Sequence, residues 1–121
     1  MTTGIRPIAP SELPAVVNRY LDARRGRDIG AAVGSYTPDA TVVDEGKTYT
    51  GPAEIRTWLS RSATEYTYTT TMVAAAQLDD HVYDVLHHLE GNFPGGEVDL
   101  HFRFTLRDGQ IQRLVIEPES A

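Results

Sequence analysis

Cysteine is absent from the 121-residue sequence, so neither a disulfide framework nor thiol chemistry is available to it. A long apolar run is also missing. The first ten residues, MTTGIRPIAP, contain neither the basic segment nor the apolar segment of a signal peptide. We therefore expect a soluble, cytoplasmic protein that has no membrane partner.

Positive charge is scarce, with 11 basic residues against 17 acidic ones and a formal net charge of −6. Surfaces that bind nucleic acid are marked by clustered lysine and arginine side chains. The basic cluster here is Arg24-Arg25-Gly26-Arg27, which falls at the end of an expected helix, where cations favourably oppose the helix dipole. We expect no nucleic-acid partner.

Familiar reaction motifs are missing as well. The sequence has no metal-ligand spacing of histidine and acidic residues, no glycine-rich phosphate loop and no nucleophile elbow. We therefore expect no metal and no cofactor. Any chemistry would depend on the side chains alone.

The N-terminal half contains three segments with helical spacing. The first begins after Ser11, a plausible N-cap, and ends at Gly26. Its apolar stripe follows the i, i+3, i+4 pattern and consists of Leu13, Val16, Val17, Tyr20 and Leu21. A short second helix is expected from Asp28 to Tyr36. The third opens at Gly51-Pro52, and its apolar face consists of Ile55, Trp58 and Leu59.

The rest of the chain is predicted to form strands. Residues 40–44 form the first, and residues 65–77, 81–91, 97–107 and 110–117 form a meander whose connections have good turn chemistry. Helices followed by an antiparallel meander indicate an α+β fold, and the length fits one domain, ordered over about residues 11–118.

The strand at 97–107 has two unlike faces. One carries alternating apolar residues, namely Val98, Leu100, Phe102, Phe104 and Leu106, and must meet the helices. The other face is only partly polar and has few helices to cover it. A second copy of the sheet is a natural partner, so we expect a homodimer through the outer face.

Five motifs resemble the nuclear-transport-factor-2-like superfamily, also called the cystatin-like cone, and especially its SnoaL-like and ketosteroid-isomerase-like members. The resemblance covers residues 11–118, and the motifs are VVNRY, YTPDATVVDEG, GPAEIRTWL, LEGNFPGG and LHFRF. It implies a curved antiparallel sheet that wraps with three helices into a cone with an internal pocket.

The resemblance also implies site residues. Tyr20 and Asp44 fall on the positions of the isomerase tyrosine, which hydrogen-bonds the developing enolate, and of the aspartate that moves the proton. Tyr36 and Trp58 fall on aromatic pocket positions of the second and third helices. Leu100 departs from the pattern, because the isomerases carry a protonated acid there. Losing one such donor costs about 10²–10³ in rate, so a proficient steroid isomerase is not expected.

Two of these assignments have structural alternatives. Asp44 either starts the Asp-Glu-Gly-Lys turn as a solvated acid or points into the cone beside Trp58 and Tyr20. Tyr20 is either a catalytic donor or a core tyrosine whose hydroxyl is satisfied.

His87 and His88 are adjacent in a strand, so they face opposite sides and one of them must face the cone. We place His88 in the pocket as a ligand-binding residue, together with Leu100 and Phe102.

The first functional hypothesis is a cofactor-independent enzyme of isomerase or cyclase type, which transfers a proton next to a carbonyl inside a hydrophobic pocket. The second is a non-catalytic protein that binds a small hydrophobic, aromatic or carbonyl ligand. The third is a dimeric interaction module with a filled cone. Cavity volume separates these hypotheses, and it depends on sheet curvature, which no motif reports.

Overall fold

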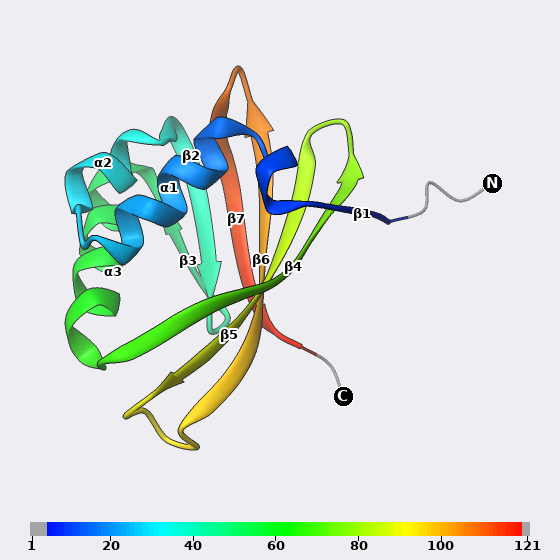
Figure 1. The fold of residues 1–121 in the computed structure, drawn as a ribbon. Coiled ribbons are helices and arrows are strands. Elements are labelled where there is room, and N and C mark those ends of the chain that lie inside the picture. Colours follow the sequence, from blue (N-terminus) through cyan, green and yellow to red (C-terminus); the bar gives the residue numbers. More distant parts are fainter. Residues whose placement is uncertain (1–4, 120–121) are drawn as a thin grey trace.

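The computed structural model describes residues 5–119. Within them, one curved, unclosed sheet of seven strands has three helices on its concave side (Figure 1). The strands are β1 (Arg6–Ile8), β2 (Tyr36–Asp44), β3 (Lys47–Thr50), β4 (Tyr68–Asp79), β5 (Val82–Gly91), β6 (Glu97–Arg107) and β7 (Gln110–Pro118). The helices are α1 (Ala15–Arg25), α2 (Ile29–Gly34) and α3 (Gly51–Glu65). This is the α+β cone expected from the sequence.

The sheet order is β1-β4-β5-β6-β7-β2-β3. Strands β4 to β7 form the expected antiparallel meander, whereas β2 runs parallel to β7 and pairs with β3 in a hairpin. That hairpin turns through Glu45 and Gly46, which both have positive φ angles, as a two-residue turn of this kind requires. Its register pairs Asp44 with Lys47, so the acid occupies the last ladder position of β2.

The core lies between the concave face of the sheet and the helices. Side chains from β2, β6 and β7 meet the apolar stripes of α1 and α3 there, and the fully buried ones include Val17, Tyr20, Val42, Ile55, Phe104, Ile111 and Leu114. The buried residues of α1 and α3 match the predicted stripes, except that Leu13 precedes α1. No helix between residues 5 and 119 is long and apolar enough to cross a membrane.

The N-terminal boundary differs from the prediction. Ser11 lies in a short 3₁₀ turn, η1 (Pro10–Glu12), and α1 begins only after Pro14. The turn is closed by the Glu12 carboxylate, which accepts a hydrogen bond from the backbone N–H of Ala9 at 2.8 Å. Before this turn, β1 pairs with β4. The ordered chain therefore starts before residue 11.

Tyr36 was wrongly placed in the second helix. Helix α2 ends at Gly34, and Tyr36 is the first residue of β2, where it pairs with Ile111 of β7. Two glycines in six residues make α2 a weak helix, so strand pairing overrides its helical spacing. Helix α3, in contrast, is well formed and runs to Glu65, where a strand was expected.

Gly91 ends β5 where the backbone of β4 passes very close. A Cβ atom at this position would lie 2.5 Å from the Cβ of Tyr68 and would collide with the carbonyl oxygen of Thr67. We therefore expect Gly91→Ala to lower the free energy of unfolding in urea by about 1–3 kcal/mol. Gly34→Ala is the control, because no atom lies within 4 Å of its new Cβ. It should be neutral or gain up to about 1 kcal/mol, and equal effects of the two substitutions would contradict the close approach.

Candidate active site

Arg24 projects from α1 into the interior of the cone. It follows Tyr20 by four residues and so continues the inward face of the helix. Its Cζ lies 5.1 Å from the ring centre of Trp58, 5.2 Å from that of Phe102 and 5.8 Å from that of Tyr20. Distances below about 6 Å allow a cation–π attraction. One guanidinium therefore joins aromatic rings from α1, α3 and β6.

Tyr20 and Tyr36 form a buried pair of phenols. The Tyr36 hydroxyl donates to the Tyr20 oxygen at 2.5 Å, and Nη1 of Arg24 donates to the same oxygen at 3.5 Å. Burial raises the pKa of Tyr20, although the nearby Arg24 opposes the rise, and burial together with Tyr20 raises the pKa of Tyr36 well above its usual value. Both groups are neutral at neutral pH. The Tyr20 oxygen accepts two bonds and keeps its own proton.

Asp44 lies at the end of β2, on the same face as the buried Val42. Its Oδ2 accepts a hydrogen bond from Nε1 of Trp58 at 3.0 Å, whereas its Oδ1 has no hydrogen-bond partner within residues 5–119. The carboxylate is partly buried and reaches α3, so it does more than begin a solvated turn. Asp44 and Tyr20 are linked through intermediate contacts, from Trp58 to Arg24 and from Arg24 to Tyr20.

The placement of His88 in the pocket was wrong. His88 lies on the outer face, where its ring nitrogens contact carboxylates of Asp99 at 2.6 Å and Glu90 at 2.9 Å. His87 faces the interior, because it alternates in phase with the buried Val85 and Leu89.

His87 is only 2% exposed and meets the ring of Phe102 edge-on, with 4.7 Å between ring centres. Neither of its ring nitrogens has a hydrogen-bond partner in the described part of the chain. Burial, together with the positive charges of Arg24 and Arg25, lowers the pKa of His87 to about 4. The imidazole is therefore neutral, with one N–H donor and one acceptor nitrogen.

Leu100 and Phe102 both lie on the inner face of β6, as predicted. Leu100 pairs across the strands with His87 and is partly buried against the core. Phe102 is 5% exposed and contacts both Arg24 and His87 through its ring. The position that carries an acid in the isomerases is thus apolar here, and a polar side chain stands directly opposite it.

A narrow cleft lies beside Arg24, between the three helices and the start of β4. It has a volume of about 20 Å³, which is room for about one water molecule, and Arg24, Arg27, Leu59 and Tyr68 are among its lining residues. An aromatic ligand is much larger than this cleft. Access for such a ligand therefore requires the Arg24 side chain to move.

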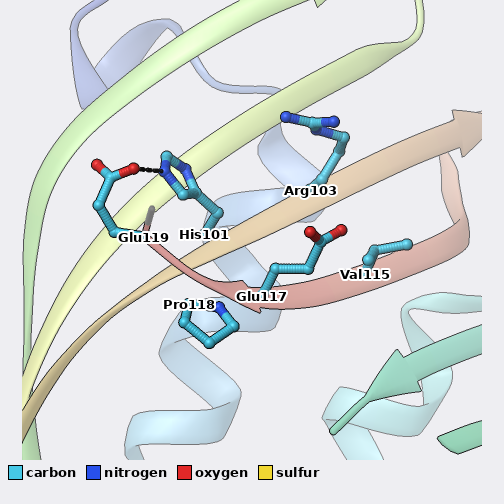
Figure 2. A pocket seen from close by; sticks show the side chains of 6 residues that line it. All are labelled: His101, Arg103, Val115, Glu117, Pro118 and Glu119. Carbon is cyan, nitrogen blue, oxygen red and sulfur yellow. Dashed lines mark hydrogen bonds and ion pairs between the residues drawn. The ribbon is translucent and has the colours of Figure 1, made fainter. Parts of the chain in front are cut away.

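A second cleft, with a volume of about 210 Å³, lies on the outer face over β6 and β7 (Figure 2). Its lining consists of His101, Arg103, Val115, Glu117, Pro118 and Glu119. Partial burial alone would lower the pKa of His101, but hydrogen bonds to the carboxylates of Glu119 and Asp84 raise it above its usual value. This open, charged cleft contains none of the predicted site residues.

Sequence reasoning missed Arg24 as an interior residue, because it assigned the whole basic cluster to the helix end. Arg25 does fit that description and pairs with Asp22. The missed signal was the helical stripe itself, since Arg24 lies three residues after Leu21 and four after Tyr20.

Within residues 5–119, no group of three or more histidine and acidic side chains could hold a metal ion.

The chain belongs to the SnoaL-like family, whose domain model matches residues 17–114. It is similar to a proposed polyketide cyclase from Sinorhizobium meliloti, with 33% identity over 91% of this chain and 100% of that chain and a TM-score of 0.85. No curated protein is similar enough in sequence to count as a relative.

More distant structures share the fold. A protein with a ketosteroid isomerase-like fold from Catenulispora acidiphila, in complex with trimethylamine, has 21% identity over 86% of this chain and 85% of that chain, with a TM-score of 0.75. A protein from Mycobacterium tuberculosis, in complex with estradiol-17β-hemisuccinate, has 13% identity over 84% of this chain and 88% of that chain, with a TM-score of 0.70. Both likenesses concern the nuclear-transport-factor-2-like fold alone.

Replacement of His87 should show what its buried imidazole costs. Unsatisfied buried polar groups cost about 1–3 kcal/mol, so we expect His87→Phe to raise the free energy of unfolding at pH 7. Because the pKa of His87 falls from 6.5 to about 4 on folding, the unfolded chain binds more protons between those values. The wild type therefore loses about 2 kcal/mol between pH 7 and pH 5 through this residue, a loss that the variant avoids.

Urea unfolding at the two pH values measures both effects. His81→Phe, at an exposed turn position, is the control and should change neither value. A His87→Phe variant that is less stable than the wild type and equally sensitive to acid would contradict the burial of a neutral, unpartnered imidazole.

Proposed function

We propose that this chain is a cofactor-independent enzyme that moves a proton next to a carbonyl group, as isomerases and cyclases do. The observation that carries the proposal is the Asp44 carboxylate, which Trp58 holds at the edge of an aromatic interior through one oxygen. The other oxygen has no hydrogen bond within the described residues and is the candidate base. Membership of the SnoaL-like family and the similarity to a proposed polyketide cyclase support this reading.

In the proposed mechanism, Asp44 accepts a proton from the carbon beside the substrate carbonyl. The proton that Tyr20 retains forms a hydrogen bond to the carbonyl oxygen, on which negative charge develops. Tyr36 strengthens Tyr20 as a donor, because it donates its own proton to the Tyr20 oxygen. The enolate then takes the proton back at another carbon in an isomerisation, or attacks a second carbonyl in an aldol-type ring closure.

The base and the oxyanion donor each contribute to the reaction rate by a typical factor. A positioned base supplies about 10²–10⁴-fold in rate. An oxyanion donor supplies about 10²–10³-fold, and Leu100 provides none. The proposed enzyme therefore works with one phenolic donor from Tyr20, which favours substrates whose α-protons are already acidic, such as β-dicarbonyl compounds.

Asp44→Asn tests the base directly. We expect it to slow the exchange of α-protons for deuterium in a panel of cyclic ketones and β-dicarbonyl compounds by about 10²–10⁴-fold, because an amide does not accept the proton. Nuclear magnetic resonance of the substrates measures the exchange. Glu45→Gln is the matched control, because Glu45 is exposed in the adjacent turn and should leave the rate unchanged. Equal exchange by wild type and Asp44→Asn would exclude Asp44 as the base.

The second candidate function is binding without catalysis. The aromatic lining by Trp58, Phe102 and Tyr20 supports it, because such surfaces hold planar organic ligands whether or not a base is present. The complexes of the Catenulispora acidiphila and Mycobacterium tuberculosis proteins with small organic molecules support ligand binding by this fold in general. Saturable binding without any α-proton exchange would favour this function over the enzyme.

We also propose that two copies of the chain pair through the outer face of the sheet. The outer cleft combines His101 and Arg103 with Glu117 and Glu119. A surface that carries both charge signs side by side suits a two-fold interface, in which each patch meets its own copy.

Sedimentation velocity at micromolar concentration tests the pairing. We expect a dimer for the wild type and a shift towards monomer for Arg103→Glu, which makes the cleft strongly acidic on both copies. Arg56→Glu, on the exposed face of α3, makes the same charge change elsewhere and should leave the dimer intact. A monomeric wild type would exclude this interface.

A further inference from the structure

Arg24 is a cation without an anion. Of the nine other arginines, Arg25, Arg103 and Arg107 lie within 4.0 Å of carboxylates of Asp22, Asp84 and Asp39, and the remaining six are exposed, whereas Arg24 is partly buried. Within residues 5–119, no carboxylate comes within that distance of the Arg24 guanidinium, whose contacts are with three aromatic rings and the Tyr20 hydroxyl. Arg24 is partly buried, and charges that are withdrawn from water are normally paired, so this arrangement calls for an explanation.

His87 is the second unsatisfied group in the same interior. It is almost fully buried, and both ring nitrogens lack hydrogen-bond partners among the described residues. Native proteins rarely leave such atoms without partners. His87 and Arg24 contact the ring of the same residue, Phe102, at 4.7 Å and 5.2 Å between the respective centres. Within residues 5–119, a cation without a carboxylate partner and a neutral imidazole without a hydrogen-bond partner therefore lie around one aromatic ring.

The narrow cleft beside Arg24 is also basic. Arg24 and Arg27 line the narrow cleft together with one acid, Asp28. The Asp28 carboxylate caps α2, where it accepts the backbone N–H of Ala31 at 3.0 Å. In a chain with a net charge of −6, this opening combines two cations with one acid that is already engaged. Such an opening favours the approach of an anion.

We propose that the cone binds the carboxylate of a planar aromatic or conjugated acid, with Arg24 as its ion-pair partner and His87 as a further hydrogen-bond donor. The proposal rests on the proposed function, because it names the substrate class of the same site. A guanidinium binds a carboxylate through two parallel hydrogen bonds, which a single interior arginine provides without a second cation.

Ligand binding would exchange one set of contacts for another. The guanidinium gives up part of its contact with Trp58 and Phe102 and gains an ion pair, which is stronger in a water-poor interior than in water. The planar ring of the ligand takes over the aromatic faces that Arg24 leaves. The neutral His87 donates from one ring nitrogen to the carboxylate and so satisfies an atom that has no partner among residues 5–119.

A charge-matched ligand series tests the proposal. Aromatic acids of one to three rings, among them 2-naphthoate, are each compared with their neutral amides by isothermal titration calorimetry at pH 7. We expect wild type to bind at least one acid more than tenfold more tightly than its amide. Arg24→Met keeps the length and apolar character of the side chain but should abolish that preference, and His87→Phe should weaken acid binding without creating amide binding.

Two further variants complete the design. Arg25→Met removes the neighbouring charge, which is already paired with Asp22 on the surface, and should keep the full preference. Arg24→Lys keeps the charge but loses the paired hydrogen bonds, so it should bind the acid with intermediate affinity. If Arg24→Met does not fold, Arg24→Lys still tests the ion pair, because it retains the positive charge in a folded protein.

The outcomes distinguish this inference from the proposed enzyme activity. Equal binding of acids and amides by wild type, or no binding of any acid, would overturn the role of Arg24. Exchange of α-protons in neutral ketones could then still depend on Asp44. A charge preference that depends on Arg24, in a protein that exchanges no α-protons, would support the anion site and exclude the enzyme.

Discussion

The interior of this protein is organised around one partly buried charge, the guanidinium of Arg24, and the three aromatic rings that surround it. Each ring is held by a neighbour from another element. Asp44 accepts the indole N–H of Trp58, Tyr36 bonds the hydroxyl of Tyr20, and His87 packs edge-on against Phe102. The proposed base, the phenol pair and the unpartnered imidazole thus all contact residues that touch Arg24. Movement of that one side chain would change the surroundings of Trp58, Tyr20 and Phe102.

This polar interior is expected to stabilise the fold less than an apolar interior of the same volume would. Moving a guanidinium out of water costs several kcal/mol, and each cation–π contact returns about 0.5–2 kcal/mol. His87 adds a further cost, because its two nitrogens are buried without partners in the described chain. Apolar residues would fill the same volume more favourably. Interior polar groups that weaken the fold are expected where a protein keeps a site prepared for a ligand.

Periodicity predicted the architecture well, because the helical stripes and alternating strands are long and regular. It failed where competing pairings decide the outcome. Tyr36 has helical spacing, but its pairing with Ile111 places it in a strand. The site was predicted less well, because the alternation of side chains along a strand shows only that His87 and His88 face opposite sides. The neighbours Val85 and Leu89 carried the missing information about which side is buried. Arg24 was read by its charge alone, although its position continued an apolar stripe.

Leu100 and Arg24 are best understood together. An acid at position 100 would face the interior opposite His87, as the side chain of Leu100 does. Phe102 lies two residues further along the same face and contacts the Arg24 guanidinium, so an ionised acid at position 100 would weaken the attraction of that guanidinium for an anionic ligand. Leucine at this position removes an oxyanion donor. It also means that no acid at position 100 competes with an anionic ligand for the charge of Arg24. The departure from the isomerase pattern therefore changes the electrostatic preference of the cone, from a site that donates a proton from a neutral acid to one that attracts an anion.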